Sequence, residues 1–514
     1  MKKVIAVVLF VLVSVGAYAQ QNTVRHPSGF GVSAPVWSMG QENSVTGSQQ
    51  ERETHPQRGF VINRQHPAPS VDILLQQEAL PPVGVTLGAS FAGTPFNGGV
   101  PSDDNLAVGP NHIVQTVNTE FSVYNKTGTK LSGPTKFIKL FISLKSSSQC
   151  ATLATDPVVL YDRAADRWLI AEIGFNSAQT SYSECVAVSK TNDPTGAYFL
   201  WAFNSGALDY DKASVWATAS NSAYLFSNIV GFQNVGSSLC GFDRTKALAG
   251  NSAAAMLCQG TPVSDFVWYL PGDMDGPTPP VDGTPGLFLA WNISTNNQFE
   301  LRKLTFNFTS GTSSLSNPTI ITVPAFNGAC AFPSDCVPQS GVKGKLTALG
   351  DRLMYRFAIR HFADHDRAVV NHSVYSQGTQ VGIRWYEFYD PTGSFTLNQS
   401  GTYSPDTTNY RWMASGAEDK NADLALGYSI SSSTIFPSIA ITGRVPGDPA
   451  GTLESEQVIV SGAAASTTDR WGDYTLMSVD PTDDCTFWYT NQYLTIKGRA
   501  WVTNISSFKF TGCS

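Results

Sequence analysis

A hairpin-like unit recurs along this chain, and it constrains the fold more than any other feature of the sequence. Each unit has a short apolar strand, a tight turn rich in Asp, Asn and Gly, and an aromatic-rich second strand, as in "DPVVLYDRAADRWLIAEI" and "DYTLMSVDPTDDCTFWYTNQY". The turns centre near residues 110, 164, 221, 295, 350, 420 and 482. The unit therefore repeats about every 62 residues, and a repeat of this kind is typical of radial arrays of β-sheets.

We predict an all-β fold, namely a seven-bladed β-propeller of four-stranded antiparallel blades that occupies residues 83–514. The first strand of each unit is expected to be the inner strand of a blade. In the fifth unit, "KLTAL" is the expected inner strand, and "RLMYRFAIRHF", "RAVVNHSVY" and "VGIRWYEFYD" follow it outward. Residues 83–92 belong to no other unit, so we expect them to close the ring as the fourth strand of the last blade.

The N-terminus has the pattern of a secretory signal peptide over residues 1–19. Two lysines precede an apolar run over residues 4–16 that is too short to span a bilayer, and an Ala-Tyr-Ala cleavage site ends at residue 19. Residues 20–82 are polar without a sustained period, which predicts a flexible leader. No later segment reads as a transmembrane helix. We therefore expect a secreted protein, extracellular or periplasmic, and its Met-Lys-Lys start is bacterial in character.

The eight cysteines fit an oxidising compartment, and their single, spread positions favour structural disulfides over a zinc site. If each blade folds mostly within itself, the bridges join sequence neighbours. The expected pairs are Cys150–Cys185, Cys240–Cys258, Cys330–Cys336 and Cys485–Cys513.

Several long stretches resemble a family of exported bacterial β-propeller-like proteins. They include "PSDDNLAVGPNHIVQTVN", "DPVVLYDRAADRWLIAE", "RLMYRFAIRHFADHDRAVVNHSV", "GIRWYEFYD" and "RWGDYTLMSVDPTDDCTFWYTNQY", in order from about residue 85 to the C-terminus. The family's usual Asp-Thr-Asn-Gly is replaced here by Asp103-Asp104-Asn105-Leu106. The resemblance implies an exported propeller-like domain and brings no established activity with it.

Charge limits the class of partner. Charged residues are 14% of the chain, the net charge is −7 and no basic stripe is present, so nucleic acid is not an expected partner. Charged groups do gather where the expected inner strands begin, and such a ring is suited to an acidic sugar because guanidiniums bind carboxylates in a bidentate manner. The candidate ligand-binding residues are Asp104, Asp156, Asp211, Arg411, Arg470 and Asp473. The alternative is that these groups cap strand ends and pair between blades.

Two other stretches are candidate sites. "RFAIRHFADHDRAVVNH" holds Arg356, Arg360, His361, His365, Asp366 and His372, which fit a metal or acid–base site or, alternatively, an exposed outer turn. "GDMDGPTPPVDG" starts like an oxygen-ligand calcium loop. Its candidate ligands for a structural calcium ion are Asp273, Asp275 and Asp282.

The sequence supports two functions of different classes. The first is a monomeric binding scaffold that recognises an extracellular glycan or protein. The second is a polysaccharide-active enzyme, a glycoside hydrolase or lyase that acts on acidic glycans at the axial channel. No nucleophile elbow, phosphate loop or HExxH motif is present, and fold alone does not choose between the two functions.

Overall fold

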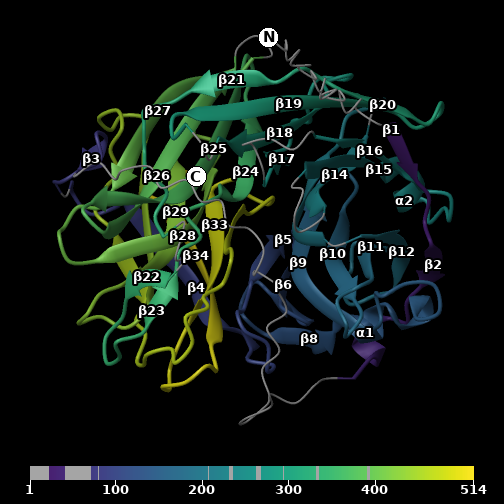
Figure 1. Cartoon of the computed structure of the whole chain (residues 1–514), viewed down its shortest axis with the longest axis horizontal. Coiled ribbons are helices and arrows are strands. Elements are labelled where there is room, and N and C mark those ends of the chain that lie inside the picture. Colours follow the sequence, from purple (N-terminus) through teal and green to yellow (C-terminus); the bar gives the residue numbers. More distant parts are fainter. Residues whose placement is uncertain are drawn as a thin grey trace, which may run out of the picture.

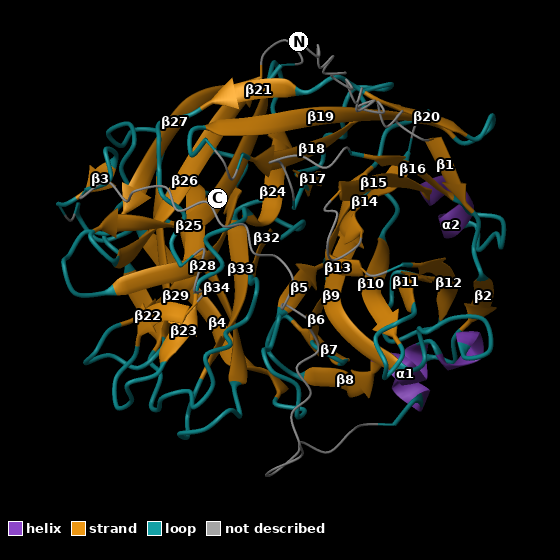
Figure 2. Cartoon of the chain, viewed as in Figure 1, coloured by secondary structure: helices purple, strands orange, loops and turns teal. Residues whose placement is uncertain are grey.

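The computed structural model describes residues 22–40, 71–78, 80–206, 208–220, 222–230, 236–261, 268–292, 295–330, 335–390 and 394–514. The predicted signal peptide and residues 41–70 of the predicted leader lie outside these ranges. Over the described ranges the fold is all-β, and the strands follow one another around the molecule as a series of sheets (Figure 1, Figure 2).

The first three sheets alternate regularly along the chain, because runs of β-branched and aromatic residues are separated by polar turns. The first sheet consists of β5 (Asn105–Val108), β6 (His112–Val117), β7 (Glu120–Asn125) and β8 (Lys130–Lys136). The second contains β9 (Leu153–Asp162), β10 (Arg167–Phe175), β11 (Tyr182–Ser189) and β12 (Tyr198–Ser205). The third contains β13 (Leu208–Trp216), β14 (Ala223–Val230), β15 (Gly236–Asp243) and β16 (Met256–Gly260).

The next two groups of strands are joined into one ten-stranded sheet by a parallel pair, β17 with β24. One half contains β17 (Leu270–Asp275), β18 (Gly286–Trp291), β19 (Gln298–Asn307), β20 (Thr312–Leu315) and β21 (Thr319–Thr322). The other half contains β24 (Met354–His361), β25 (Asp366–Gln377), β26 (Gln380–Asp390) and β27 (Thr396–Tyr403). A separate two-stranded sheet lies between these halves in sequence, formed by β22 (Asp335–Pro338) and β23 (Lys345–Thr347).

The last sheet confirms the expected closure of the chain. β4 (Val85–Pro95) pairs along its length with β34 (Val502–Phe510), the last strand of the chain. β32 (Leu476–Val479) and β33 (Thr486–Tyr493) complete this sheet. The sheet before it contains β28 (Tyr410–Glu418), β29 (Leu424–Ser431), β30 (Ser438–Arg444) and β31 (Gln457–Val460).

The described part of the predicted leader differs from a flexible segment, because it adds strands to the outer edges of sheets. β1 (Asn22–Arg25) pairs with β16, β2 (Gly29–Val32) pairs with β12, and β3 (Leu75–Gln76) pairs with β27. The Val36 side chain is also buried in the core that adjoins the second sheet. Open backbone groups at a sheet edge accept another strand regardless of its polarity, which composition alone does not reveal.

The first strands of the sheets contact one another in a closed sequence: β5, β9, β13, β17, β24, β28, β32 and again β5. Several of them contain a bulge with a residue at positive φ, as at Asp156, Tyr210 and Met413. The expectation for the fifth unit is wrong in one respect. "KLTAL" forms β23 and pairs with β22, so the innermost strand there is β24.

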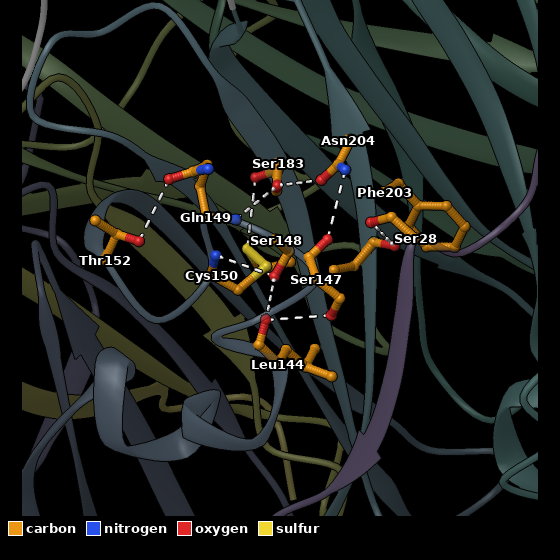
Figure 3. Close-up of a disulfide and its surroundings, with 12 residues drawn as sticks. Ser28, Leu144, Ser147, Ser148, Gln149, Cys150, Thr152, Ser183, Phe203 and Asn204 are labelled. Atoms are coloured by element: carbon orange, nitrogen blue, oxygen red, sulfur yellow. Dashed lines mark hydrogen bonds between the residues drawn. A yellow bond between two sulfur atoms is a disulfide. The ribbon is translucent and has the colours of Figure 1, made fainter.

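Four disulfides have the expected pairs: Cys150–Cys185, Cys240–Cys258, Cys330–Cys336 and Cys485–Cys513. The Cys150–Cys185 bridge links the segment that precedes β9 to β11 (Figure 3). There the Gln149 backbone N–H donates to the Ser183 hydroxyl over 3.0 Å, and that hydroxyl donates to the Asn204 side chain over 2.8 Å.

Helical structure is limited to short turns within the described residues. These are η1 (Val36–Ser38), α1 (Phe137–Leu140), η2 (Ile142–Leu144) and α2 (Arg244–Leu248). None of the described helices has the length and apolarity needed to cross a membrane.

Candidate functional site

The first strands of the sheets surround a central axis, and aromatic side chains fill this axis near the beginning of those strands. Lys212 of β13 places its Nζ 4.0 Å from the ring centroid of Tyr210 and 4.0 Å from that of Tyr474. The Tyr355 ring of β24 lies 6.0 Å from the same nitrogen. All four side chains are buried. They form what we call the axial plug, defined as Tyr210, Lys212, Tyr355 and Tyr474.

Further along the same strands lies a pocket, which we call the axial pocket. Its apolar wall comes from β5, β9, β13 and β32, through residues that include Val108, Val159, Val215 and Leu476. Its polar lining comes from β9, the β9–β10 turn, β17, β24 and β32. The polar side chains are Tyr161, Arg163, Asp273, Asp275, Arg356 and Ser478.

Arg356 holds two carboxylates at this pocket. One guanidinium nitrogen donates to Asp273 over 2.7 Å, and the other bonds to Asp275. The Asp273 carboxylate also accepts from the Val215 backbone N–H over 3.1 Å. Burial raises the pKa of Asp273 above its usual value, while the Arg356 charge opposes this. The pocket thus contains a compact group of two acids and one base.

A second guanidinium lies at the rim of the pocket. Arg163 forms a bidentate pair with Asp484, with nitrogen–oxygen distances of 2.6 and 3.0 Å. The Arg163 side chain is 31% exposed, which leaves it accessible to a ligand in the pocket. A planar guanidinium in this position suits hydroxyl pairs or a carboxylate.

The predicted calcium ligands are not gathered around one point. Asp273 and Asp275 hold Arg356, whereas Asp282 accepts from the backbone N–H and hydroxyl of Ser220 over 2.7 and 2.6 Å. The single guanidinium of Arg356 thus pairs with both carboxylates that were expected to begin a calcium loop. Among the described residues, the group of potential ligand atoms close enough to share an ion is Asp419 with Cys485 and Cys513, and those two cysteines form a disulfide. Calcium therefore stays a prediction.

The acids expected at the strand beginnings are buried. Asp104 accepts from the hydroxyls of Ser102 and Thr490, each over 2.8 Å, and burial raises its pKa to about 6. Asp156 accepts from the Tyr210 backbone N–H over 3.1 Å. Burial and the nearby Glu184 carboxyl raise the pKa of Asp211. These three acids lie near the beginnings of strands. None of them lines the axial pocket.

The arginines expected to bind a ligand are also engaged. Arg411 is fully buried, and it pairs with Glu456 over 2.6 Å and with Asp406 over 2.5 Å. Arg470 pairs with Asp473 over 2.9 Å. Both arginines are thus engaged in ion pairs, and their role in ligand binding stays a prediction.

The adjacent tryptophans Trp412 and Trp471 do lie side by side, with ring centroids 5.7 Å apart. Both are buried, and neither offers a stacking face to solvent. The two repeat units that contain Trp412 and Trp471 are therefore adjacent, but their tryptophan rings form no open binding surface.

The histidine-rich stretch does not form one site. His361 bonds to Asp366 over 2.5 Å and His365 to Asp364 over 2.6 Å near the β24–β25 turn. His372 is instead buried among aromatic rings, and desolvation holds its pKa well below the usual range.

The sequence pointed to three of the six polar side chains of the axial pocket but assigned them to different sites. Asp273 and Asp275 were expected in a calcium loop, and Arg356 in the histidine stretch. Arg163 and the axial plug were missed altogether. The signal for Arg163 is its position in the first turn of a repeat unit, directly after β9, which belongs to the closed series of first strands.

No protein family matches the sequence, and no curated protein matches it either. Weak likeness to solved structures is found. An exo-β-1,3-galactanase from Phanerochaete chrysosporium is 10% identical, with a TM-score of 0.33 over 84% of this chain and 97% of that one. An α-L-arabinofuranosidase from Fusarium graminearum is 8% identical, with a TM-score of 0.34 over 87% and 99%. Drosophila Semaphorin 2a is 7% identical, with a TM-score of 0.36 over 84% and 76%. Scores this low assign no function.

Proposed function

We propose that this chain is an exported, monomeric seven-bladed β-propeller of four-stranded antiparallel blades that binds an extracellular glycan in the axial pocket. The closed sequence of contacts among the first strands supports the blade count. The strands β1, β2 and β3 would then be additions to the outer edges of three blades. The signal-peptide pattern of residues 1–19 supports export, as do four disulfides, which suit an oxidising compartment.

The observation that carries the proposal is the axial pocket itself. Six inner strands line it, and charged and polar side chains from several of these strands converge beside an apolar wall, as polar groups converge in small-ligand sites. Arg356 with its two carboxylates and Arg163 with Asp484 supply both donors and acceptors. Sugar hydroxyls need such mixed partners, because each hydroxyl both donates and accepts.

Calorimetric titration against a panel of polysaccharides tests the proposal. The panel contains neutral β-glucan, galactan, arabinan and xylan, and acidic polygalacturonate and alginate. We expect saturable binding to at least one member, and R163A should weaken it by about 1.5–3 kcal/mol, the range for a hydrogen bond to a charged group.

R167A is the matched control, since Arg167 belongs to the same β9–β10 hairpin but donates to the Ala165 and Asp166 carbonyls. Equal losses in R163A and R167A would contradict the placement of the ligand. Absence of binding to the whole panel would contradict glycan recognition and favour a protein partner.

A glycoside hydrolase or lyase is the second candidate, and one observation favours it. Two carboxylates share the pocket, and the pKa of Asp273 is raised by burial, as in a general acid. New reducing ends, or the absorbance of unsaturated uronates, would appear on the same panel and disappear in D273N. Binding without product would leave the scaffold function.

A further inference from the structure

The axial plug and the axial pocket occupy successive levels of the same strands. Tyr355 immediately precedes Arg356 on β24, and Tyr474 lies two residues before Leu476 of β32. On β13, Lys212 likewise precedes the pocket residue Val215. The buried plug therefore blocks the axis next to the pocket, although none of its side chains is among those that line the pocket.

Hydrogen bonds fix the plug across the axis. The Tyr355 hydroxyl donates to the Ala213 carbonyl over 2.7 Å, and so links β24 to β13, which are separated by β17 in the ring. The Tyr474 hydroxyl donates to the Pro157 carbonyl of β9 over 3.1 Å. The Tyr210 hydroxyl donates to the Leu353 carbonyl over 3.2 Å.

Burial shows how completely the plug fills the axis. Tyr355, Tyr474 and Lys212 are each 0% exposed, and Tyr210 is 2% exposed. Lys212 reaches from β13 to the Tyr474 ring, which belongs to the sheet of β32 on the other side of β9 and β5. Three rings and an ammonium group locked by hydrogen bonds do not yield to a polymer chain.

Both guanidiniums at the pocket already have carboxylate partners. Arg163 pairs with Asp484, and Arg356 pairs with Asp273 and Asp275. A ligand with a net charge gains no uncompensated partner there and would have to displace an existing ion pair. Hydroxyl groups, in contrast, bond to guanidinium and carboxylate without disturbing the pairs.

From this geometry we infer that the axial pocket is blind and receives one end of a glycan chain, a terminal neutral sugar unit, and not the middle of a chain. The inference rests on the proposed glycan-binding function and adds the substrate class. The polymer has to approach from the Arg163 rim, because the plug prevents passage along the axis.

A series of fragments of one neutral polysaccharide tests this inference. The probe is the neutral panel member that binds, as the polymer and as purified oligosaccharides of two to eight units, titrated calorimetrically. Recognition of an end predicts one protein-binding site per glycan chain. The Kd per glycan chain end should be the same for all fragments of about four units or more. The apparent affinity per mass of glycan should therefore fall as the glycan lengthens. Affinity that instead rises with each added unit, with several protein molecules bound per polymer, would overturn the inference.

Different results would contradict glycan binding and end recognition. If no glycan binds, the proposed function fails. If glycans bind along the chain, the function stands and the blind pocket does not. Exclusive binding of polygalacturonate or alginate would overturn the assignment to a neutral unit.

A pocket-filling variant gives an independent readout. Ser478 lines the pocket and is partly exposed, so S478W should fill the space without entering the core. S177W, in the exposed β10–β11 turn, is the matched control. We expect at least a tenfold loss of end binding in S478W and none in S177W, with unchanged melting of both. Full binding by a folded S478W would overturn the inference, and the fragment series decides the matter if S478W does not fold.

Discussion

The carboxyl group of Asp104 should make the protein less stable as the pH rises, and D104N should remove this dependence. Asp104 is 0% exposed, and burial raises its folded pKa to about 6, against an ordinary 3.8. The folded state therefore binds more protons than the unfolded state between these two values. Stability is highest below pH 3.8 and falls as the pH rises through 6.

The size of the effect follows from the pKa difference. About two pKa units at 1.36 kcal/mol each correspond to about 3 kcal/mol, of which about 2.5 kcal/mol develops between pH 4 and pH 7.5. The asparagine introduced by D104N would be nearly isosteric and cannot ionise, and its amide can still bond to the hydroxyls of Ser102 and Thr490. The free energy of unfolding of D104N relative to wild type should thus increase by about 2.5 kcal/mol over this pH range.

Urea unfolding at pH 4, 5, 6 and 7.5 measures this difference directly. D364N is the control, because the Asp364 side chain is 80% exposed. Parallel pH profiles for wild type and D104N would refute the reasoning, since they would show that Asp104 ionises as freely in the folded protein as in the unfolded chain.

Three further outcomes are expected. A chain that starts at residue 83 should fold with a lowered Tm, because it lacks β1–β3. A chain that starts at residue 96 also lacks β4 and should not melt cooperatively. Equal melting of the two chains would contradict closure by β4. R411A should lower the free energy of unfolding by about 2–4 kcal/mol, because it removes the guanidinium that pairs with the partly buried carboxylates of Asp406 and Glu456. Glycan titration of R411A should show unchanged binding. Unchanged stability with weakened binding would instead support a ligand role for Arg411. Chelation with EDTA tests for a bound calcium ion. A fall in Tm on chelation that D275A abolishes would support the ion. An unchanged Tm would show that Arg356, and not a calcium ion, holds the carboxylates of Asp273 and Asp275.

Local patterns predicted much of the fold because most neighbouring strands in the sheets are also consecutive in sequence. The hairpin of β32 and β33 reads directly from its sequence, with Pro481 and the following acids ending one strand and starting the next. The disulfides are local for the same reason. Even the pairing of β4 with β34 was predictable, since residues 83–92 had strand character and no other partner.

The innermost strands of two groups escaped prediction. β17 reads "LPGDMD", with a proline, a glycine and two acids in six residues, and it lacks the pattern of a strand. Its pairing with β24 is parallel and spans about eighty residues of sequence. "KLTAL" has the better strand pattern, but it pairs with β22 beside the Cys330–Cys336 bridge.

The candidate site was misread for a related reason. Asp273 and Asp275 look like a calcium loop only if β17 is a loop, and Arg356 looks like part of a histidine site only if β24 is an outer strand. Once both strands are innermost, the three side chains meet at the axis. Charge pairing between distant strands, as in Arg411 with Glu456, is likewise set by packing and not by sequence spacing.

A crystal structure of the protein soaked with the best-binding oligosaccharide of the neutral series shows whether the axial pocket receives the end of a glycan chain. We expect one terminal sugar ring in the axial pocket, within hydrogen-bond distance of Arg163 or of the Asp275–Arg356 pair, with the rest of the chain leaving past the Arg163 rim. A glycan bound on an outer sheet face or at the other end of the axis, with the axial pocket empty, would contradict this expectation.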